Sequence, residues 1–166
     1  MMKIRTVLIV IVFVLWSGSM VFAQGHMYAT WDTLEIDTCA SAWLIKNFVD
    51  TEAEFRFFPK GEIITEGIPF DTPDSDLRRT GNMSAFETIL AKYKITDPAL
   101  KEIGRIIHDI EINYWGKKET GEAVKLNQEI KGIIDSVADN PRRLEKSSIF
   151  FDALYKRIIP NSDNSG

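Results

Sequence analysis

The chain has 166 residues, with 20 Lys and Arg, 24 Asp and Glu, and a formal net charge of −4. This length suits a single domain that buries a core without disulfides, and one cysteine excludes an internal disulfide. The acidic balance argues against a nucleic-acid-binding protein, because phosphate backbones are bound by clustered basic residues.

Residues 1–23 have the three parts of a secretory signal peptide: Lys3 and Arg5, an apolar run over residues 7–16, and a small-residue end at Ala23. We expect cleavage after Ala23 and an exported protein, periplasmic or secreted, without stable membrane insertion. The alternative is an uncleaved N-terminal anchor. Without Lys3 and Arg5 the mature chain keeps 18 basic against 24 acidic residues, a net charge of −6.

Residues 24–159 are predicted to form one α+β domain, in which a small strand-helix-strand sheet is covered by a mostly helical C-terminal half. Alternating aromatic and Thr residues predict parallel strands at 28–34 and 53–58, on either side of a helix at 38–48. Asp37 precedes this helix and is expected to cap it. Cys39 lies in its first turn, either as a buried thiol or as a reactive one.

Helical periodicity is absent from residues 59–81, where Pro, Gly, Asp and Thr dominate and one short strand at 68–71 is expected. This loop is either functional or a plain connector. Four helices follow, at 84–93, from 97 to about 114, at 120–137 and from 140 to 159, and a flexible tail is expected at 160–166. Their predicted starts are a capping box at Ser84 and Glu87, and the pairs Asp97-Pro98 and Asn140-Pro141.

The helix from Asp97 carries a candidate pair, His108 and Glu111, which are three residues apart and so share one side. Gly104 would leave room above the imidazole, and Trp115 would wall the far side. Such a pair can ligate a metal or act as a base and its orienting group. The alternative is a half-buried histidine beside a solvated glutamate.

Acidic residues from other segments are expected to converge with this pair, because sites in strand-helix layers form where strands end and helices begin. The predicted ligands of a divalent metal, Mn or Zn, are Asp37, Asp71, His108 and Glu111. The alternatives are a helix cap for Asp37 and a turn residue for Asp71. Asp32 is a further acid that the sequence does not distinguish from a surface residue.

Arg78 and Arg79 end the long loop just before the helix at 84–93. A guanidinium group and a helix N-terminus together suit a tetrahedral oxyanion such as chromate, sulfate or phosphate. These two arginines are therefore the predicted oxyanion ligands, with ordinary surface residues as the alternative.

Residues 37–50 followed by 53–55 resemble the chromate-resistance family, which includes exported chromate-resistance proteins and the C-terminal domain of ChrB. That family's opening runs Asp-x-x-Ala-x-x-Trp-Leu-Ile-x-x-Phe-Ile-Asp and then Ala-Glu-Phe. Further similarity covers residues 69–73, 79–86, 97–100, 106–110 and 151–155, so it spans nearly the whole mature chain. The resemblance implies a role in chromate, oxyanion or metal stress, and leaves open whether the protein is an enzyme.

The family often has His where Arg79 stands, Cys where Ser84 stands and Cys near Ser41, so this chain offers less support for thiol redox chemistry or chromate reduction. Family members that regulate transcription carry an added N-terminal DNA-binding region; we expect none here, so control of transcription through DNA contact is disfavoured. A fainter similarity, through Asp32 and residues 37–42, is to the manganese-binding aspartate-histidine-histidine phosphoesterases, although their paired histidines are missing.

Three hypotheses follow. The domain binds a small oxyanion or a divalent metal, it is a metal-dependent hydrolase or phosphoesterase with a metal-bound water, or it is an interaction protein with a large apolar patch on its last two helices.

Overall fold

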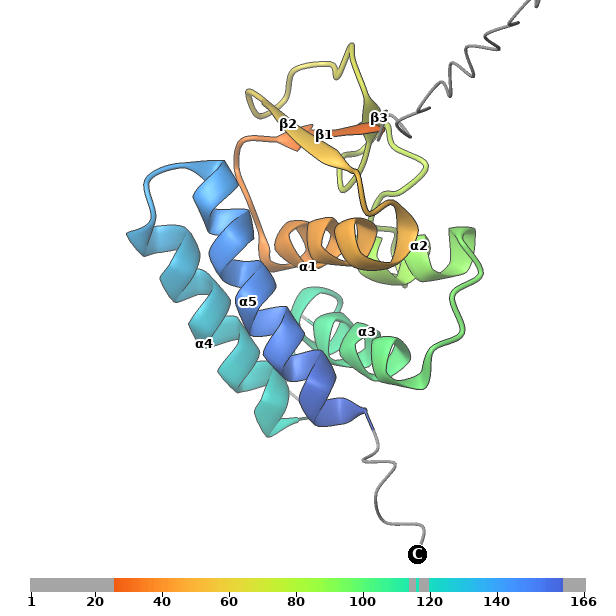
Figure 1. The fold of residues 1–166 in the computed structure, drawn as a ribbon, viewed down its shortest axis with the longest axis vertical. Coiled ribbons are helices and arrows are strands. Elements are labelled where there is room, and N and C mark those ends of the chain that lie inside the picture. Colours follow the sequence, from red (N-terminus) through yellow and green to blue (C-terminus); the bar gives the residue numbers. More distant parts are fainter. Residues whose placement is uncertain (1–25, 114–115, 117–119, 160–166) are drawn as a thin grey trace, which may run out of the picture.

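Three parallel strands rich in aromatic and β-branched residues form a small sheet at one end of the molecule (Figure 1). The structure is a computed structural model that describes residues 26–113, 116 and 120–159. Strand β1 (Met27–Trp31) lies between β2 (Glu54–Phe58) and β3 (Ile68–Pro69), and both pairings are parallel. The parallel strands and the short third strand confirm the sequence prediction.

Helix α1 (Ile36–Leu44) connects β1 to β2, and each of its nine residues is buried. It continues as a π-helix, η1 (Ile45–Val49), which ends with a hydrogen bond from the backbone N–H of Asp50 to the carbonyl of Ile45 at 2.8 Å. The helix begins two residues earlier than predicted, and its N-cap is Glu35. Asp37 therefore lies inside the first turn, so the prediction that it caps this helix is wrong.

Helices α2 (Ala85–Lys92) and α3 (Pro98–Glu111) begin as their sequences predict. Ser84 and Glu87 form the capping box of α2, and the Asp97 carboxylate accepts from the first turn of α3. Gly104 lies where α3 packs on α2, since an added Cβ would be 3.5 Å from side-chain atoms of Glu87, Leu90 and Phe86. This glycine serves helix packing; it does not open a space above His108.

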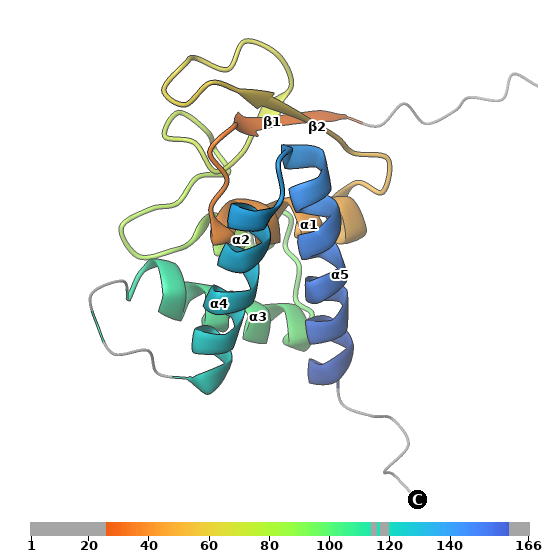
Figure 2. The ribbon, with the colours of Figure 1, turned by 90° about the vertical axis from the view of Figure 1, so that its left-hand side faces the viewer.

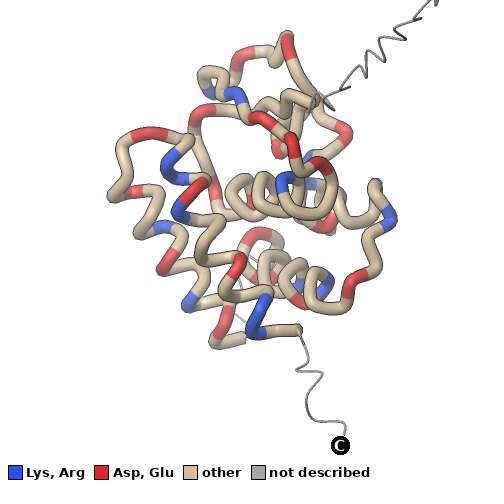
Figure 3. The backbone as a smooth tube through the Cα atoms, viewed as in Figure 1, with Lys and Arg blue, Asp and Glu red and all other residues tan. Residues whose placement is uncertain are grey.

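Helices α4 (Gly121–Ser136) and α5 (Asn140–Ile158) lie side by side along one flank (Figures 1 and 2), and both basic and acidic positions occur along each of them (Figure 3). The N-cap of α5 is Asp139, one residue before the predicted cap at Asn140. Helix α5 packs on α1, where the rings of Trp43 and Phe151 stack at 5.6 Å and the Trp43 indole donates to Asp152 at 2.7 Å. In the described part of the chain, five α-helices beside one small sheet confirm the α+β class.

The hydrophobic core lies between the sheet, α1 and the surrounding helices, and Cys39 is part of it. Burial raises the pKa of the Cys39 thiol to about 12, so this cysteine is the buried thiol and not the reactive one. Within residues 26–113 and 120–159 no helix is both long and apolar enough to cross a bilayer. The predicted signal peptide, Trp115 and the predicted tail lie outside the described residues.

Candidate functional site

A hollow of about 390 Å³ opens at the carboxyl ends of β1 and β3, beside the start of α1. The chain leaves β1 for β2 on one side, and β3 then pairs on the other side, so this is the point where the strand order reverses. Parallel α/β sheets bind their ligands at such switch points. We call this hollow the strand-end pocket; it is lined by Thr30, Trp31, Thr33, Glu35, Thr38, Lys60, Asp71, Thr72, Pro73, Arg78 and Arg79.

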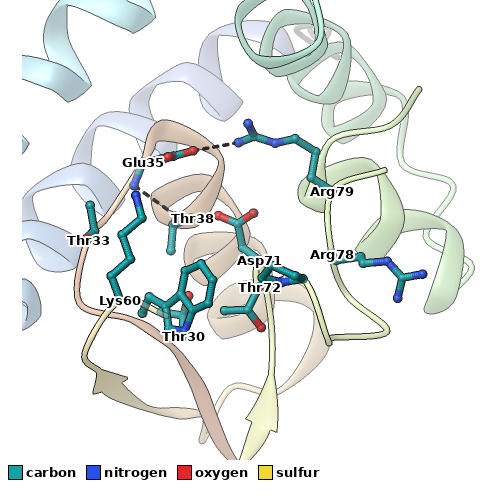
Figure 4. A pocket seen from close by; sticks show the side chains of 11 residues that line it. Thr30, Thr33, Glu35, Thr38, Lys60, Asp71, Thr72, Arg78 and Arg79 are labelled. Carbon is teal, nitrogen blue, oxygen red and sulfur yellow. Dashed lines mark hydrogen bonds and ion pairs between the residues drawn. The ribbon is translucent and has the colours of Figure 1, made fainter. Parts of the chain in front are cut away.

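Asp71 lies at the centre of the strand-end pocket, two residues after the short strand β3 ends at Pro69 (Figure 4). Its backbone is left-handed, with φ of 49°, a conformation that Asp tolerates better than most residues. The hydroxyl of Thr38 donates to the carboxylate at 2.5 Å. Burial, and then the charge of Asp37, raise the pKa of Asp71 well above its usual value.

Asp37 is fully buried behind the pocket and caps α2 across the interface between the two helices. Its two oxygens accept from the backbone N–H groups of Ala85 at 2.6 Å and Phe86 at 2.9 Å. Burial raises the pKa of Asp37, although these two hydrogen bonds and Arg79 oppose the shift. The N-terminus of α2 is thus occupied by a carboxylate of the protein, and the prediction that it forms part of an oxyanion cradle is wrong.

Arg79 is surrounded by acids. Its Nη2 lies 2.9 Å from Glu111 and 3.2 Å from Glu35, and its Nε lies 3.4 Å from Asp37. Burial lowers the pKa of Arg79, but Glu111 and then Asp37 outweigh this effect and raise it, so the group stays charged. Arg79 thus joins Glu35, Asp37 and Glu111 into one ionic cluster, and Asp71 lies near enough for its charge to affect Arg79.

The other predicted residues lie apart from this cluster. The ring of His108 pairs with Glu87 at 2.9 Å, on the exposed side of α2 and α3. Arg78 lines the strand-end pocket, but its guanidinium points away from the centre (Figure 4) and donates to the carbonyl of Ser75. The geometry therefore supports Arg79 as a site residue more strongly than Arg78 or His108.

Glu111 is nearly buried at the end of α3, and its carboxylate accepts from the backbone N–H of Asp37 in the first turn of α1. Burial raises the pKa of Glu111 to about 7, against the opposing effect of Arg79. Glu111 and Asp37 thus each neutralise the N-terminus of a helix other than their own.

Sequence reasoning missed two charged residues of the pocket, Glu35 and Lys60. Each follows a strand: Glu35 immediately precedes α1, and Lys60 is two residues after β2. The backbone N–H of Lys60 donates to Asp32 at 3.1 Å, and its side chain extends along the pocket wall (Figure 4). The sequence signal that could have identified them is their position just after predicted parallel strands.

The predicted Mn or Zn site gains no support from this geometry. In the described part of the chain, no three His, Cys, Asp or Glu side chains are grouped so that they could hold a metal ion. Arg79 supplies the positive charge between Asp37 and Glu111, and backbone N–H groups occupy the Asp37 oxygens. As they stand, these donors do not fit a metal.

The sequence profile of the ChrB C-terminal domain matches residues 28–158, which is most of the chain and all of the described sheet and helices except the first residue of β1. The chain belongs to the ChrB C-terminal domain family. Protein ChrB of Cupriavidus metallidurans is 26% identical over 134 residues, which are 80% of this chain and 40% of ChrB. The chain thus spans less than half the length of that relative. No solved structure matches.

Membership in the ChrB C-terminal domain family makes this a protein of the chromate-resistance type. The phosphoesterase alternative gains no support, because His108 lies outside the ionic cluster and the family that matches is a different one. On the described parts of α4 and α5, the large apolar side chains that are exposed are Val124 and Ile149, with Ile159 just beyond α5.

Proposed function

We propose that this ChrB-type domain binds a small tetrahedral oxyanion of the chromate type in the strand-end pocket. The observation that carries the proposal is the chemistry of the lining: Lys60 and Arg79 bring positive charge to a hollow at the switch point of a parallel sheet. Charge-assisted hydrogen bonds from such groups are the strongest that an oxyanion can accept.

The neutral part of the lining suits the same ligand. Thr30 and Thr72 are buried, and each brings a hydroxyl group that can donate to an oxyanion, whereas the hydroxyl of Thr38 already donates to Asp71. Of the two acids in the wall, Glu35 is paired with Arg79, and Asp71 has a raised pKa that favours its neutral form. The wall is therefore more positive than its acid content suggests.

Calorimetric titration of the purified mature chain with chromate, sulfate and phosphate tests the proposal. Trp31 lines the pocket, so sulfate and phosphate should also change its fluorescence, and Trp31→Phe should remove that change. Lys60→Ala should weaken binding about 10- to 100-fold, which is the scale of one charged hydrogen bond.

Lys92→Ala is the matched control, because Lys92 pairs with Asp76 on the surface and does not line the pocket. Unchanged binding in Lys60→Ala, or no binding of the three anions at millimolar concentration by the wild-type chain, would refute the proposal.

We further propose that the domain acts outside the cytoplasm, which rests on the signal-like sequence at residues 1–23. Expression of the full chain followed by cell fractionation and N-terminal sequencing should give a periplasmic or secreted protein that begins at Gln24. Recovery of the uncleaved chain in the cytoplasm would contradict this.

A further inference from the structure

Arg79 lies in the wall between two cavities. The second cavity, of about 740 Å³, opens between the β1–α1 loop, the end of α3 and α4. It has an aliphatic side, formed by Leu34, Ile36, Ile110 and Ile134, and a polar side that includes Glu111, Asn127, Lys131 and Asp135. Arg79 and Glu35 line both this cavity and the strand-end pocket.

The guanidinium of Arg79 is held on the side of the second cavity. Its shortest ion pair, at 2.9 Å, is with Glu111, which lines the second cavity and not the strand-end pocket. Figure 4 shows the side chain extending past Asp71 toward Glu35. The Nε atom is buried, and among the described residues it has no hydrogen-bond partner, although Asp37 is 3.4 Å away. Arg79 is therefore a charged residue between the two cavities whose Nε–H group has no hydrogen-bond acceptor among the described residues.

We propose that Glu111 is a positioning residue that limits oxyanion binding, because it competes with the bound anion for the guanidinium of Arg79. This inference rests on the proposed function. An anion in the strand-end pocket draws Arg79 away from Glu111, and the anion affinity of the domain then includes the cost of breaking that ion pair. Glu111 lines the opposite cavity, so it acts on the anion through Arg79 and not by contact.

The surroundings of Glu111 determine what happens when Arg79 leaves. The neighbouring charges are Glu35 and Asp37 at the start of α1, and Lys131 and Asp135 on α4. The backbone N–H of Asp37 also donates to Glu111. On α3 itself, His108 is paired with Glu87. Without Arg79 the nearest charges are mainly acidic, so Glu111 takes up a proton, which its pKa of about 7 makes accessible near neutral pH.

The test is a titration with sulfate and with chromate at pH 7.5, comparing the wild-type chain with Glu111→Gln. The amide keeps the shape of the side chain but removes the competing charge, so both anions should bind about tenfold more tightly, the scale of one charge-assisted hydrogen bond. Glu122→Gln is the matched control: Glu122 pairs with Arg157 on the surface, and its replacement should leave affinity unchanged.

A second measurement does not depend on the folding of the variant. Calorimetric titration of the wild-type chain with sulfate at pH 7.5, in two buffers of different ionisation enthalpy, should show uptake of up to one proton per sulfate bound. The affinity for sulfate should also fall as the pH is raised from 6 to 8.

Equal or weaker anion binding by a folded Glu111→Gln, or no proton uptake by the wild-type chain, would overturn the inference while leaving the proposed function intact. If neither protein binds sulfate or chromate, the proposed function fails and this inference fails with it.

Discussion

Replacement of Asp37 by alanine should be among the most destabilising single changes in this domain. The buried carboxylate accepts two backbone N–H groups of α2, at 2.6 and 2.9 Å. Each buried donor left without a partner costs about 1–3 kcal/mol, or about 2–6 kcal/mol for the two together. The variant no longer buries an acid whose pKa is raised, which offsets part of this cost. We therefore expect Asp37→Ala to lower the free energy of unfolding by about 2–4 kcal/mol.

Urea unfolding followed by circular dichroism measures this loss, with Ser84→Ala as the reference. Ser84 caps the same helix, but its hydroxyl accepts the single N–H of Glu87 at 3.2 Å, and loss of such a cap costs about 1 kcal/mol. Asp37→Asn, which keeps one accepting oxygen, should lie between the two. A loss in Asp37→Ala no greater than in Ser84→Ala would refute the view that Asp37 holds α1 and α2 together.

Three further predictions concern stability and reactivity. The pKa of Glu111 is raised from 4.5 to about 7 in the folded chain, so the contribution of its protonated form to stability is present below about pH 4.5 and lost as pH rises through 7. Between pH 4.5 and pH 8 the free energy of unfolding of the wild-type chain should therefore fall by about 3 kcal/mol more than that of Glu111→Gln. Urea unfolding at the two pH values measures this difference. Cys39 should react with a thiol reagent at pH 8 only after unfolding in urea, and rapid labelling of the native chain would contradict its burial. Gly67→Ala should lower the free energy of unfolding by at least about 1 kcal/mol more than Gly61→Ala, as measured by thermal unfolding. Both glycines have φ above 80°, but an added Cβ at Gly67 would be 2.8 Å from the carbonyl oxygen of Met27, whereas a Cβ at Gly61 would have no atom within 4 Å. Equal losses in the two variants would refute this.

The secondary structure was predictable because local signals act within a few residues. The capping box at Ser84 and the Asp97-Pro98 start each fix a helix end through contacts inside one turn. The start of α1 was misplaced because its cap, Glu35, is not among the residues that usually cap helices, whereas Asp37 is. Asp37 does cap a helix, but that helix begins 48 residues later, and no local pattern reveals such a partner.

The site was predictable only in outline. The rule that ligands bind at the carboxyl ends of parallel strands drew attention to Asp71, which lines the strand-end pocket, whereas Arg79 was predicted from its place before a helix N-terminus that Asp37 in fact occupies. It did not predict which way the side chains turn: Arg79 points to the acids, while Arg78 points away to the carbonyl of Ser75. His108 was misjudged because helical spacing gives its neighbours on α3, whereas its partner, Glu87, belongs to α2.

The capping of helix N-termini by acids from other helices also affects how the domain folds. The start of α2 is completed by an acid from α1, and the start of α1 accepts an acid from α3. Each of these two termini is completed only when its partner helix has docked, and α1 takes part in both contacts, so the three helices should form one cooperative unit. Amide hydrogen exchange should show the first turns of α1 and α2 becoming protected together, and opening together, even though one lies near the beginning of the chain and the other near its middle.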